Sequence, residues 1–255
     1  MRLLQTDLSI YNKFDFEYPP VGVKYEWGRP EGIEQVEKEK RLALCEMLKE
    51  AHQRRAPFYF TKDDEDCFGA RMLGMTPPPP PSGESGQLGV RFEIFQEARA
   101  NAASRRHRAY NMQSGTVNYA IFSPLDKLTF EPDLLILTAN PRQTEIVERA
   151  NTYSTGEMFE SKMTHHGGCY WLYVYPYLSG KVNYMITGLT FGMKAREVFP
   201  DGLILISIPY QRIPEITQNL KEMKWVIMAY TLGREKFLEY EHRIIEGITE
   251  EFKLS

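Results

Sequence analysis

The sequence predicts an α+β protein, a single globular domain spanning residues 1–255 in which helices pack on a mixed sheet. Three observations lead to this fold class. The chain is 42% hydrophobic and 25% charged, which is typical of an ordinary globular protein. Short β-prone runs alternate with longer segments of helical periodicity. A β-β-α unit also occurs twice in the chain, and this internal duplication predicts how the sheet is built.

Charge and cysteine usage exclude several classes of protein. The formal net charge is -3, so a general nucleic-acid or membrane-surface binder is not expected. The longest apolar stretches, 169–178 and 203–210, are far shorter than the ~20 residues of a membrane span, and residues 1–10 show no cleavage pattern. Three widely spaced cysteines do not form a secreted disulfide framework. We expect a cytoplasmic protein with free thiols or thiolate metal ligands.

The first third of the chain predicts two strands and one helix. Residues 21–27 and 58–61 are β-prone runs of strand length. Residues 33–52 follow a helical period. The inward face of this helix would carry Val36, Leu44, Leu48 and Ala51. The Pro/Gly-rich segment 77–89 (PPPPPSGESGQLG) predicts a loop, either simply exposed or acting as a lid over a site.

The repeat covers residues 91–152 and 158–222. SGTVNYAI at 114–121 matches SGKVNYMI at 179–186, and PDLLILTANPRQ at 132–143 matches PDGLILISIPYQ at 200–211. Each copy predicts a β-prone strand entered through Ser-Gly and then a continuous apolar strand covered on both faces. The four strands are expected at 117–122, 134–138, 182–187 and 203–207.

Helices complete each copy of the repeat. Asn140 is expected to cap a helix that starts at Pro141, whereas the second copy has a looser start at Ser207 or Tyr210 before Pro214. Further helices are expected before each copy, at 91–109 and 158–177. A last helix at 234–252 carries one apolar stripe, which the core or a second subunit would cover.

Two cysteines are candidate functional residues. Cys67 lies beside Gly69 and Arg71, a setting suited to a partly exposed thiolate or a metal ligand, and Cys169 follows two histidines and two glycines. Three interpretations stay open: a shared zinc or iron–sulfur site, a redox pair, or inert thiols. A shared site predicts that the two cysteines lie close in space. Cys45, on the inward side of its helix, is expected to be a buried structural thiol.

Glycine and arginine near strand ends predict binding of an anionic small molecule or cofactor, because glycine lets backbone N–H groups approach an anion and arginine supplies charge. Two segments, 66–71 and 187–196, share Phe-Gly followed by Ala-Arg, and Lys194 adds charge to the second. Two strand-to-helix junctions place Arg and Gln near a helix start. The candidate residues are Phe68, Gly69, Arg71, Arg142, Gln143, Gly188, Gly192, Arg196, Gln211 and Arg212. A turn with a short helix is the competing interpretation for 187–196.

Three segments also resemble a known family. They are PVGVK at 20–24, CFGARMLG at 67–74 and IPY at 208–210. On these segments the chain resembles the domain of unknown function 169 family, an archaeal conserved region, over roughly residues 15–235. The family name records no activity, so the site hypotheses rest on the residues themselves.

Two functions follow from these patterns. The first is a small-molecule or cofactor-binding protein with a thiolate metal or iron–sulfur redox site where the repeats and the Cys67 segment meet. The second is a non-catalytic interaction module with structural cysteines. In that case the aromatic segment 170–177 and the last helix would form a homo-oligomer, such as a homodimer, interface. No hydrolase motif is present, and whether the protein is an enzyme stays open.

Overall fold

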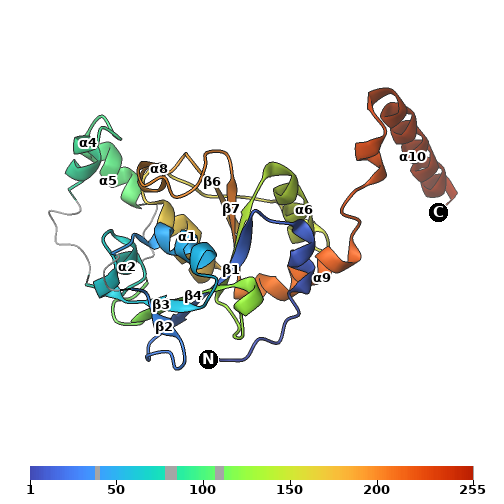
Figure 1. Cartoon of the computed structure of the whole chain (residues 1–255). Coiled ribbons are helices and arrows are strands. Elements are labelled where there is room, and N and C mark those ends of the chain that lie inside the picture. Colours follow the sequence, from blue (N-terminus) through green and yellow to red (C-terminus); the bar gives the residue numbers. More distant parts are fainter. Residues whose placement is uncertain (38–40, 78–84, 107–111, 255) are drawn as a thin grey trace. The chain divides into compact units, whose positions relative to one another are not determined.

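The computed structural model describes residues 1–37, 41–77, 85–106 and 112–254 (Figure 1). Two compact units form within the chain, Met1–Lys221 and Glu222–Ser255. A 7-stranded mixed sheet with helices around it forms the first unit, which confirms the predicted α+β class.

The sheet has the strand order β2-β3-β4-β1-β5-β7-β6. The strands are β1 Tyr18–Glu26, β2 Glu34–Gln35, β3 Phe58–Phe60, β4 Tyr119–Pro124, β5 Leu134–Ala139, β6 Asn183–Ile186 and β7 Ile204–Pro209. Neighbouring strands pair antiparallel except β2 and β3, which are parallel. Every strand expected from the sequence is confirmed to within a few residues, and β2 is an addition.

Eight of the labelled helices begin in the first unit. They are α1 Leu44–Arg54, α2 Gly69–Met72, α4 Gln87–Arg91, α5 Ala98–Arg106, α6 Pro141–Thr152, α7 Tyr175–Ser179, α8 Phe191–Ala195 and α9 Ile213–Glu222. A π-helical segment, Tyr170–Val174, leads directly into α7. In the second unit, α10 Arg234–Leu254 confirms the helix expected at 234–252, and its apolar residues Ile244, Ile245, Ile248 and Phe252 are exposed.

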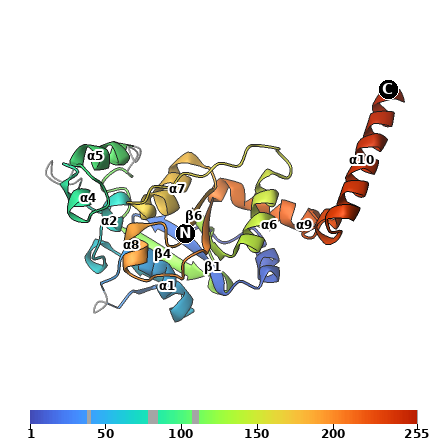
Figure 2. The ribbon, with the colours of Figure 1, turned by 90° about the horizontal axis from the view of Figure 1, so that it is seen from above.

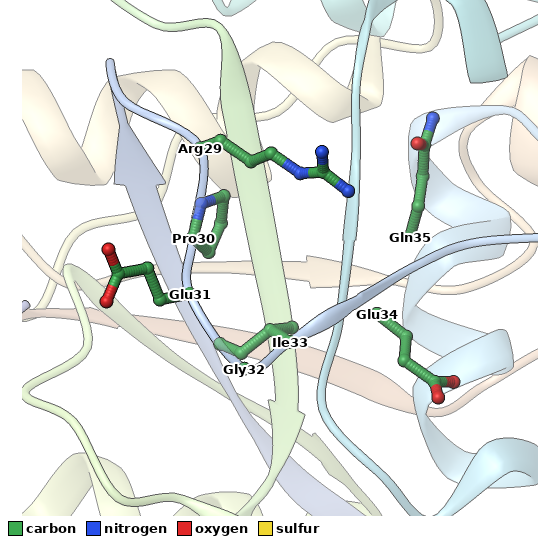
Figure 3. Close-up of a pocket in the computed structure, with 7 residues that line it drawn as sticks. All are labelled: Arg29, Pro30, Glu31, Gly32, Ile33, Glu34 and Gln35. Atoms are coloured by element: carbon green, nitrogen blue, oxygen red, sulfur yellow. The ribbon is translucent and has the colours of Figure 1, made fainter.

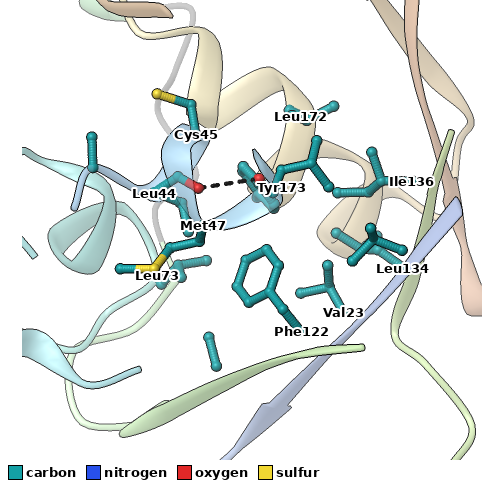
Figure 4. Packing of buried hydrophobic residues seen from close by; sticks show 14 of the residues in the cluster. Val23, Leu44, Cys45, Met47, Leu73, Phe122, Leu134, Ile136, Leu172 and Tyr173 are labelled. Atoms are coloured by element: carbon teal, nitrogen blue, oxygen red, sulfur yellow. Dashed lines mark hydrogen bonds between the residues drawn. The ribbon is translucent and has the colours of Figure 1, made fainter. Parts of the chain in front are cut away.

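Helices cover both faces of the sheet in the first unit (Figures 1 and 2). On one face, Leu44 of α1 and Tyr173 of the π-helical segment join the cluster formed by alternate strand residues such as Phe122 and Ile136 (Figure 4). On the other face, α6 packs on β5 and β7, and the Asn219 side chain of α9 donates a hydrogen bond to a carbonyl of α6. All residues of β5 are buried, as its continuous apolar sequence predicts.

The helix expected at 33–52 is wrong at residues 33–37 and 41–43, and residues 38–40 lie outside the described part of the chain. Residues 34 and 35 form β2, which pairs with β3, and the Val36 N–H donates to the Tyr59 carbonyl at 2.8 Å. The helix begins only at Leu44, where the Ala43 N–H donates to the Glu46 carboxylate at 2.8 Å. Pairing with a distant strand therefore overrides the helical period of this segment.

The two helices expected before the repeats are also shorter than predicted. The segment 91–109 contains the last residue of α4, a break at 92–97 and α5, and residues 107–109 lie outside the described part. Residues 158–167 are not helical. The Asn183 side chain of β6 accepts from the Lys162 N–H at 2.8 Å and donates to the Lys162 carbonyl at 3.0 Å. This one buried amide holds the segment extended beside the sheet.

The predicted duplication is not confirmed by the sheet. Both copies follow the order β-β-α, but β1 lies between β4 and β5, whereas β6 pairs directly with β7. The helix starts differ too. Asn140 caps α6 with Pro141 at its start, as predicted, while Pro209 is the last residue of β7 and α9 starts at Ile213. Matched sequence blocks thus occupy non-equivalent positions.

The Pro/Gly-rich loop expected at 77–89 is described only in part. Residues 78–84 lie outside the described part of the chain, and 87–89 are the first residues of α4.

Candidate functional site

The three cysteines, far apart in sequence, come together at the face of the sheet covered by α1. Cys45 is in the first turn of α1, Cys67 immediately precedes α2, and Cys169 immediately precedes the π-helical segment. All three are free thiols, and each interacts electrostatically with at least one of the others. We call Cys45, Cys67 and Cys169 the thiol cluster.

Cys45 and Cys169 are in direct contact within the thiol cluster, and we call them the contact pair. Their side chains are hydrogen-bonded to one another. Cys45 is only 4% exposed and belongs to the apolar core, and Cys169 is half-buried against the same core. The Cys45 side chain lies next to Leu44 and points away from the sheet (Figure 4).

Cys67 is positioned by a tight approach between α1 and α2. The buried Glu65 carboxylate accepts hydrogen bonds from the backbone N–H groups of Leu44, Gly69 and Ala70. Its backbone also forms a bridge with Leu42. One carboxylate therefore connects the start of α1 to the start of α2, and Cys67 lies between that carboxylate and α2.

Two arginines lie beside Cys67. Arg196, just after α8, approaches Asp66 and Glu46 at 3.4 Å each and interacts electrostatically with Cys67 and Cys45. The Arg71 guanidinium lies over the exposed Phe68 ring, 5.8 Å from its centroid. These contacts bring the end of the 187–196 segment to the Cys67 segment, as the hypothesis of a shared site requires.

Two thiols of the cluster have raised pKa values. The hydrogen bond with Cys45 favours the protonated Cys169 thiol and raises its pKa well above the ordinary value, and burial acts in the same direction. Burial also raises the pKa of Cys67, while the Phe68 N–H and the nearby Arg196 act to lower it. A thiolate at Cys67 thus has stabilising partners, whereas a thiolate at Cys169 is opposed by its neighbours.

Two buried tyrosines, Tyr25 and Tyr173, lie between the thiol cluster and the sheet and donate hydrogen bonds to backbone carbonyls there. The Tyr173 hydroxyl donates to the Leu44 carbonyl at 3.3 Å (Figure 4), and the Tyr25 hydroxyl donates to the Tyr173 carbonyl at 3.3 Å. Burial raises the pKa of both phenols well above the ordinary value. The first hydrogen bond connects the first turn of α1 to the π-helical segment, and the second connects that segment to β1. The first bond therefore helps to hold Cys45 next to Cys169.

The other candidate arginines do not join this site. Because β5 and β7 are antiparallel, the junctions that follow them lie at opposite edges of the sheet. Arg142 is exposed at one edge, and Arg212 at the other is paired with Glu157 and Glu215. The four arginines Arg71, Arg142, Arg196 and Arg212 therefore do not lie around one site, and anion binding at Arg142 and Arg212 stays a prediction. The rule that ligands bind at strand carboxyl ends holds for parallel sheets, whose carboxyl ends share one edge.

The remaining candidates have mainly structural contacts. Gln143 completes a capping box with Asn140 and donates to the Phe14 carbonyl at 2.9 Å. Gly188 has φ +86 beside Asp201, and Lys194 pairs with that same aspartate at 3.0 Å. Gly192 lies in α8, and Gln211 is exposed in a 3-10 turn. Anion binding at these positions stays a prediction.

The described residues contain no group of three or more His, Cys, Asp or Glu side chains arranged to hold a metal ion. A hollow of about 780 Å³ is lined by Arg29–Gln35 alone (Figure 3), and another of about 510 Å³ is lined by residues that include Lys24, Asp133 and Tyr210. Neither hollow is lined by a residue of the thiol cluster.

Sequence reasoning grouped Cys67 with Cys169 and missed Cys45. The expectation that Cys45 is buried is confirmed, but its hydrogen bond with Cys169 gives it a place in the site. The apolar residues around Cys45 in the sequence predict that it is buried, but they do not predict that Cys169 contacts it.

These features define an α+β protein with a cluster of free thiols between its helices. The chain belongs to the domain of unknown function 169 family, described as uncharacterised ArCR, whose model matches residues 9–219. It is 24% identical over 198 residues to the uncharacterized protein MJ0308 of Methanocaldococcus jannaschii, covering 77% of this chain and 83% of that protein. No solved structure matches the chain. Within the described residues, every helix is too short or too polar to cross a membrane.

Proposed function

We propose that the protein is a thiol redox protein in which the contact pair interconverts between two thiols and one disulfide. The observation that carries this proposal is the hydrogen bond between Cys45 and Cys169. Forming the disulfide removes two electrons and two protons, which pass to a disulfide acceptor that becomes two thiols. Hydrogen-bonded sulfurs need to approach by only roughly 2 Å to reach the S–S bond length of about 2.05 Å.

The surroundings of the contact pair support a reversible change. Cys45 lies in the first turn of α1, and Cys169 immediately precedes the π-helical segment. The Tyr173 hydroxyl of that segment donates a hydrogen bond to the Leu44 carbonyl of α1. Short π-helical segments are frequent at functional sites. Burial of Cys45 excludes external reagents, so oxidation is expected to stop at the intramolecular disulfide.

A second candidate is a thiolate metal centre, the function first expected from Cys67 and Cys169. The observation in its favour is that Cys45 and Cys67 both oppose the ionisation of Cys169, a cost that a bound cation would offset. Two thiolates on one zinc ion are roughly 4 Å apart, comparable to hydrogen-bonded sulfurs, whereas thiolates on an iron–sulfur cluster are about 6 to 7 Å apart. The contact pair therefore favours a single soft ion over a cluster.

Two further expectations accompany the proposal, and a third belongs to the alternative function. Free thiols fit a reducing compartment, so a cytoplasmic location is proposed. Arg71 and Arg196 beside Cys67 are the positions at which an anionic small molecule is proposed to bind. A homodimer through the exposed apolar residues of α10 belongs to the alternative, a non-catalytic interaction module.

Redox titration tests the proposal. Protein purified without oxygen is equilibrated with glutathione buffers of increasing oxidation, quenched with acid and alkylated, and its disulfides are mapped by mass spectrometry. We expect one two-electron transition that produces a Cys45–Cys169 disulfide, because the side chains of this pair are already hydrogen-bonded. C45S and C169S should each lose it while keeping a cooperative thermal transition.

Metal analysis of the same samples separates the two candidates. One zinc or copper ion per chain that is lost in C45S and C169S, with no Cys45–Cys169 disulfide at any glutathione ratio, would reject the redox function in favour of the metal centre. If the samples contain no bound metal and form no Cys45–Cys169 disulfide, both candidates are rejected and the interaction module is the function that is left.

A further inference from the structure

We infer that Cys67 is the thiol through which the contact pair exchanges electrons with low-molecular-weight disulfides in solution. This inference rests on the proposed redox function and adds the order in which the thiols react. An exposed thiol reacts first, and the two inner thiols react afterwards. The cluster offers one such thiol, since Cys67 is exposed, Cys169 is half-buried and Cys45 is buried.

The contact pair is poorly placed to react directly with an external disulfide. Thiol–disulfide exchange needs the attacking sulfur, the attacked sulfur and the leaving sulfur to meet in one encounter. Cys45 is 4% exposed within the apolar core, and Cys169 is hydrogen-bonded to it. A direct encounter would require α1 to separate from the π-helical segment, which the Tyr173 hydrogen bond to the Leu44 carbonyl opposes.

Cys67 has the features of a first reactant. Burial raises the pKa of its thiol, while the Phe68 N–H, which donates a hydrogen bond to the sulfur, and the nearby Arg196 act to lower it, so the thiolate has stabilising partners when it forms. Phe68 beside it is 46% exposed and carries the Arg71 guanidinium over its ring, so an apolar and a cationic contact flank the sulfur. Arg196 approaches Asp66, next to Cys67, and Glu46, next to Cys45, at 3.4 Å each, so the two cysteine segments lie side by side. Electrons can therefore pass outward from the contact pair through Cys67 to the external disulfide.

The exchange follows three balanced steps. The Cys67 thiolate attacks one sulfur of the external disulfide, forming a mixed disulfide and releasing one thiolate. A thiolate of the contact pair then attacks the Cys67 sulfur and releases the second external thiolate. The remaining thiol of the pair, as its thiolate, attacks its partner and frees Cys67. In total, one external disulfide is reduced to two thiols, and two protein thiols become the Cys45–Cys169 disulfide.

The test compares the wild type with C67S in two measurements. The rate of Cys45–Cys169 disulfide formation by glutathione disulfide at pH 8 is followed by acid quench and mass spectrometry, and the equilibrium glutathione ratio at half oxidation is measured separately. We expect C67S to slow the rate by about 100-fold and to shift the half-oxidation ratio by less than about twofold, because Cys67 acts in the pathway and not in the final disulfide.

A trapping variant provides the second arm. The double variant C45S/C169S should accumulate a stable mixed disulfide between Cys67 and glutathione, since no inner thiol remains to resolve it. C67A replaces C67S if the serine variant does not show a cooperative thermal transition. An unchanged rate in the Cys67 variant would overturn this inference alone, whereas a wild type that forms no Cys45–Cys169 disulfide would overturn the proposed function with it.

Discussion

Replacing Glu148 by Gln is expected to stabilise the protein by several kcal/mol at pH 9 and to change its stability little at pH 4. Glu148 lies on α6 and is only 7% exposed. Burial raises the pKa of its carboxyl from 4.5 to about 8, although the Asn151 side chain acts in the opposite direction. The folded protein therefore holds a proton that the unfolded chain releases at neutral pH.

The sign of the pH dependence follows from this difference. Because the folded state has the higher pKa, the stabilisation from protonated Glu148 is complete below pH 4.5 and is lost as the pH rises to about 8. Each pH unit in this window is worth about 1.4 kcal/mol, so the total over the window from 4.5 to about 8 is on the order of 5 kcal/mol. A glutamine is neutral at every pH and avoids this loss.

Chemical denaturation at pH 4, 7 and 9 measures the effect. The matched control is E145Q, one turn earlier on α6, where the carboxylate is 39% exposed and pairs with Arg149 at 2.9 Å. That variant should change the free energy of unfolding by less than about 1 kcal/mol at each pH. Parallel pH profiles for the wild type and E148Q would contradict the assignment of a buried, protonated Glu148.

Replacing Gly69 by Ala should destabilise the first unit by about 3 kcal/mol or more, the reverse of the usual effect in a helix. Glycine to alanine within a helix ordinarily stabilises by up to about 1 kcal/mol. A Cβ at residue 69, however, would lie 2.3 Å from the Leu44 Cβ and 2.6 Å from the Glu65 carboxylate. The α2 start would have to move away from α1, which breaks the hydrogen bonds that Glu65 accepts there.

Chemical denaturation again provides the measurement, with G192A as the control. In α8, a Cβ at residue 192 would meet only one atom of the flexible Arg196 side chain, at 4.0 Å. We expect that variant to unfold at the same denaturant concentration as the wild type or slightly above it. Native-state alkylation of Cys67 should also become faster in G69A, because the segment that holds this thiol is displaced. Equal stability of G69A and the wild type would show that α1 and α2 are not packed as described.

Local patterns in the sequence determined much of the fold. Continuous apolar runs identified β5 and β7, whose residues are almost all buried, and Asn140 with Pro141 identified the start of α6. The apolar stripe of 234–252 identified α10. These elements are identified by continuous apolar runs, by a capping residue and by the helical period of apolar side chains. Each of these properties depends only on residues that are close together in the sequence.

Pairing between distant residues is where these local patterns were insufficient. The helical period of 33–43 is overridden because β2 pairs with β3 and Leu42 with Glu65, and the amide of Asn183 holds 161–162 extended. The repeated blocks do not determine strand order either, since β1 enters between β4 and β5. The sequence of the repeat does not show that a strand from elsewhere in the chain lies between two of its strands in the sheet.

The candidate site shows the same division. The sequence by itself determined that Cys67 and Cys169 each lie beside glycines at a helix start, a setting that predicts chemistry at these residues. Only the tertiary structure decided that Cys45 is hydrogen-bonded to Cys169, and that Arg142 and Arg212 lie at opposite edges of the sheet. The physical reason is that local residue types determine which segments become helices and strands, while the packing of α1 against the π-helical segment and the antiparallel order of β5 and β7 determine which side chains meet.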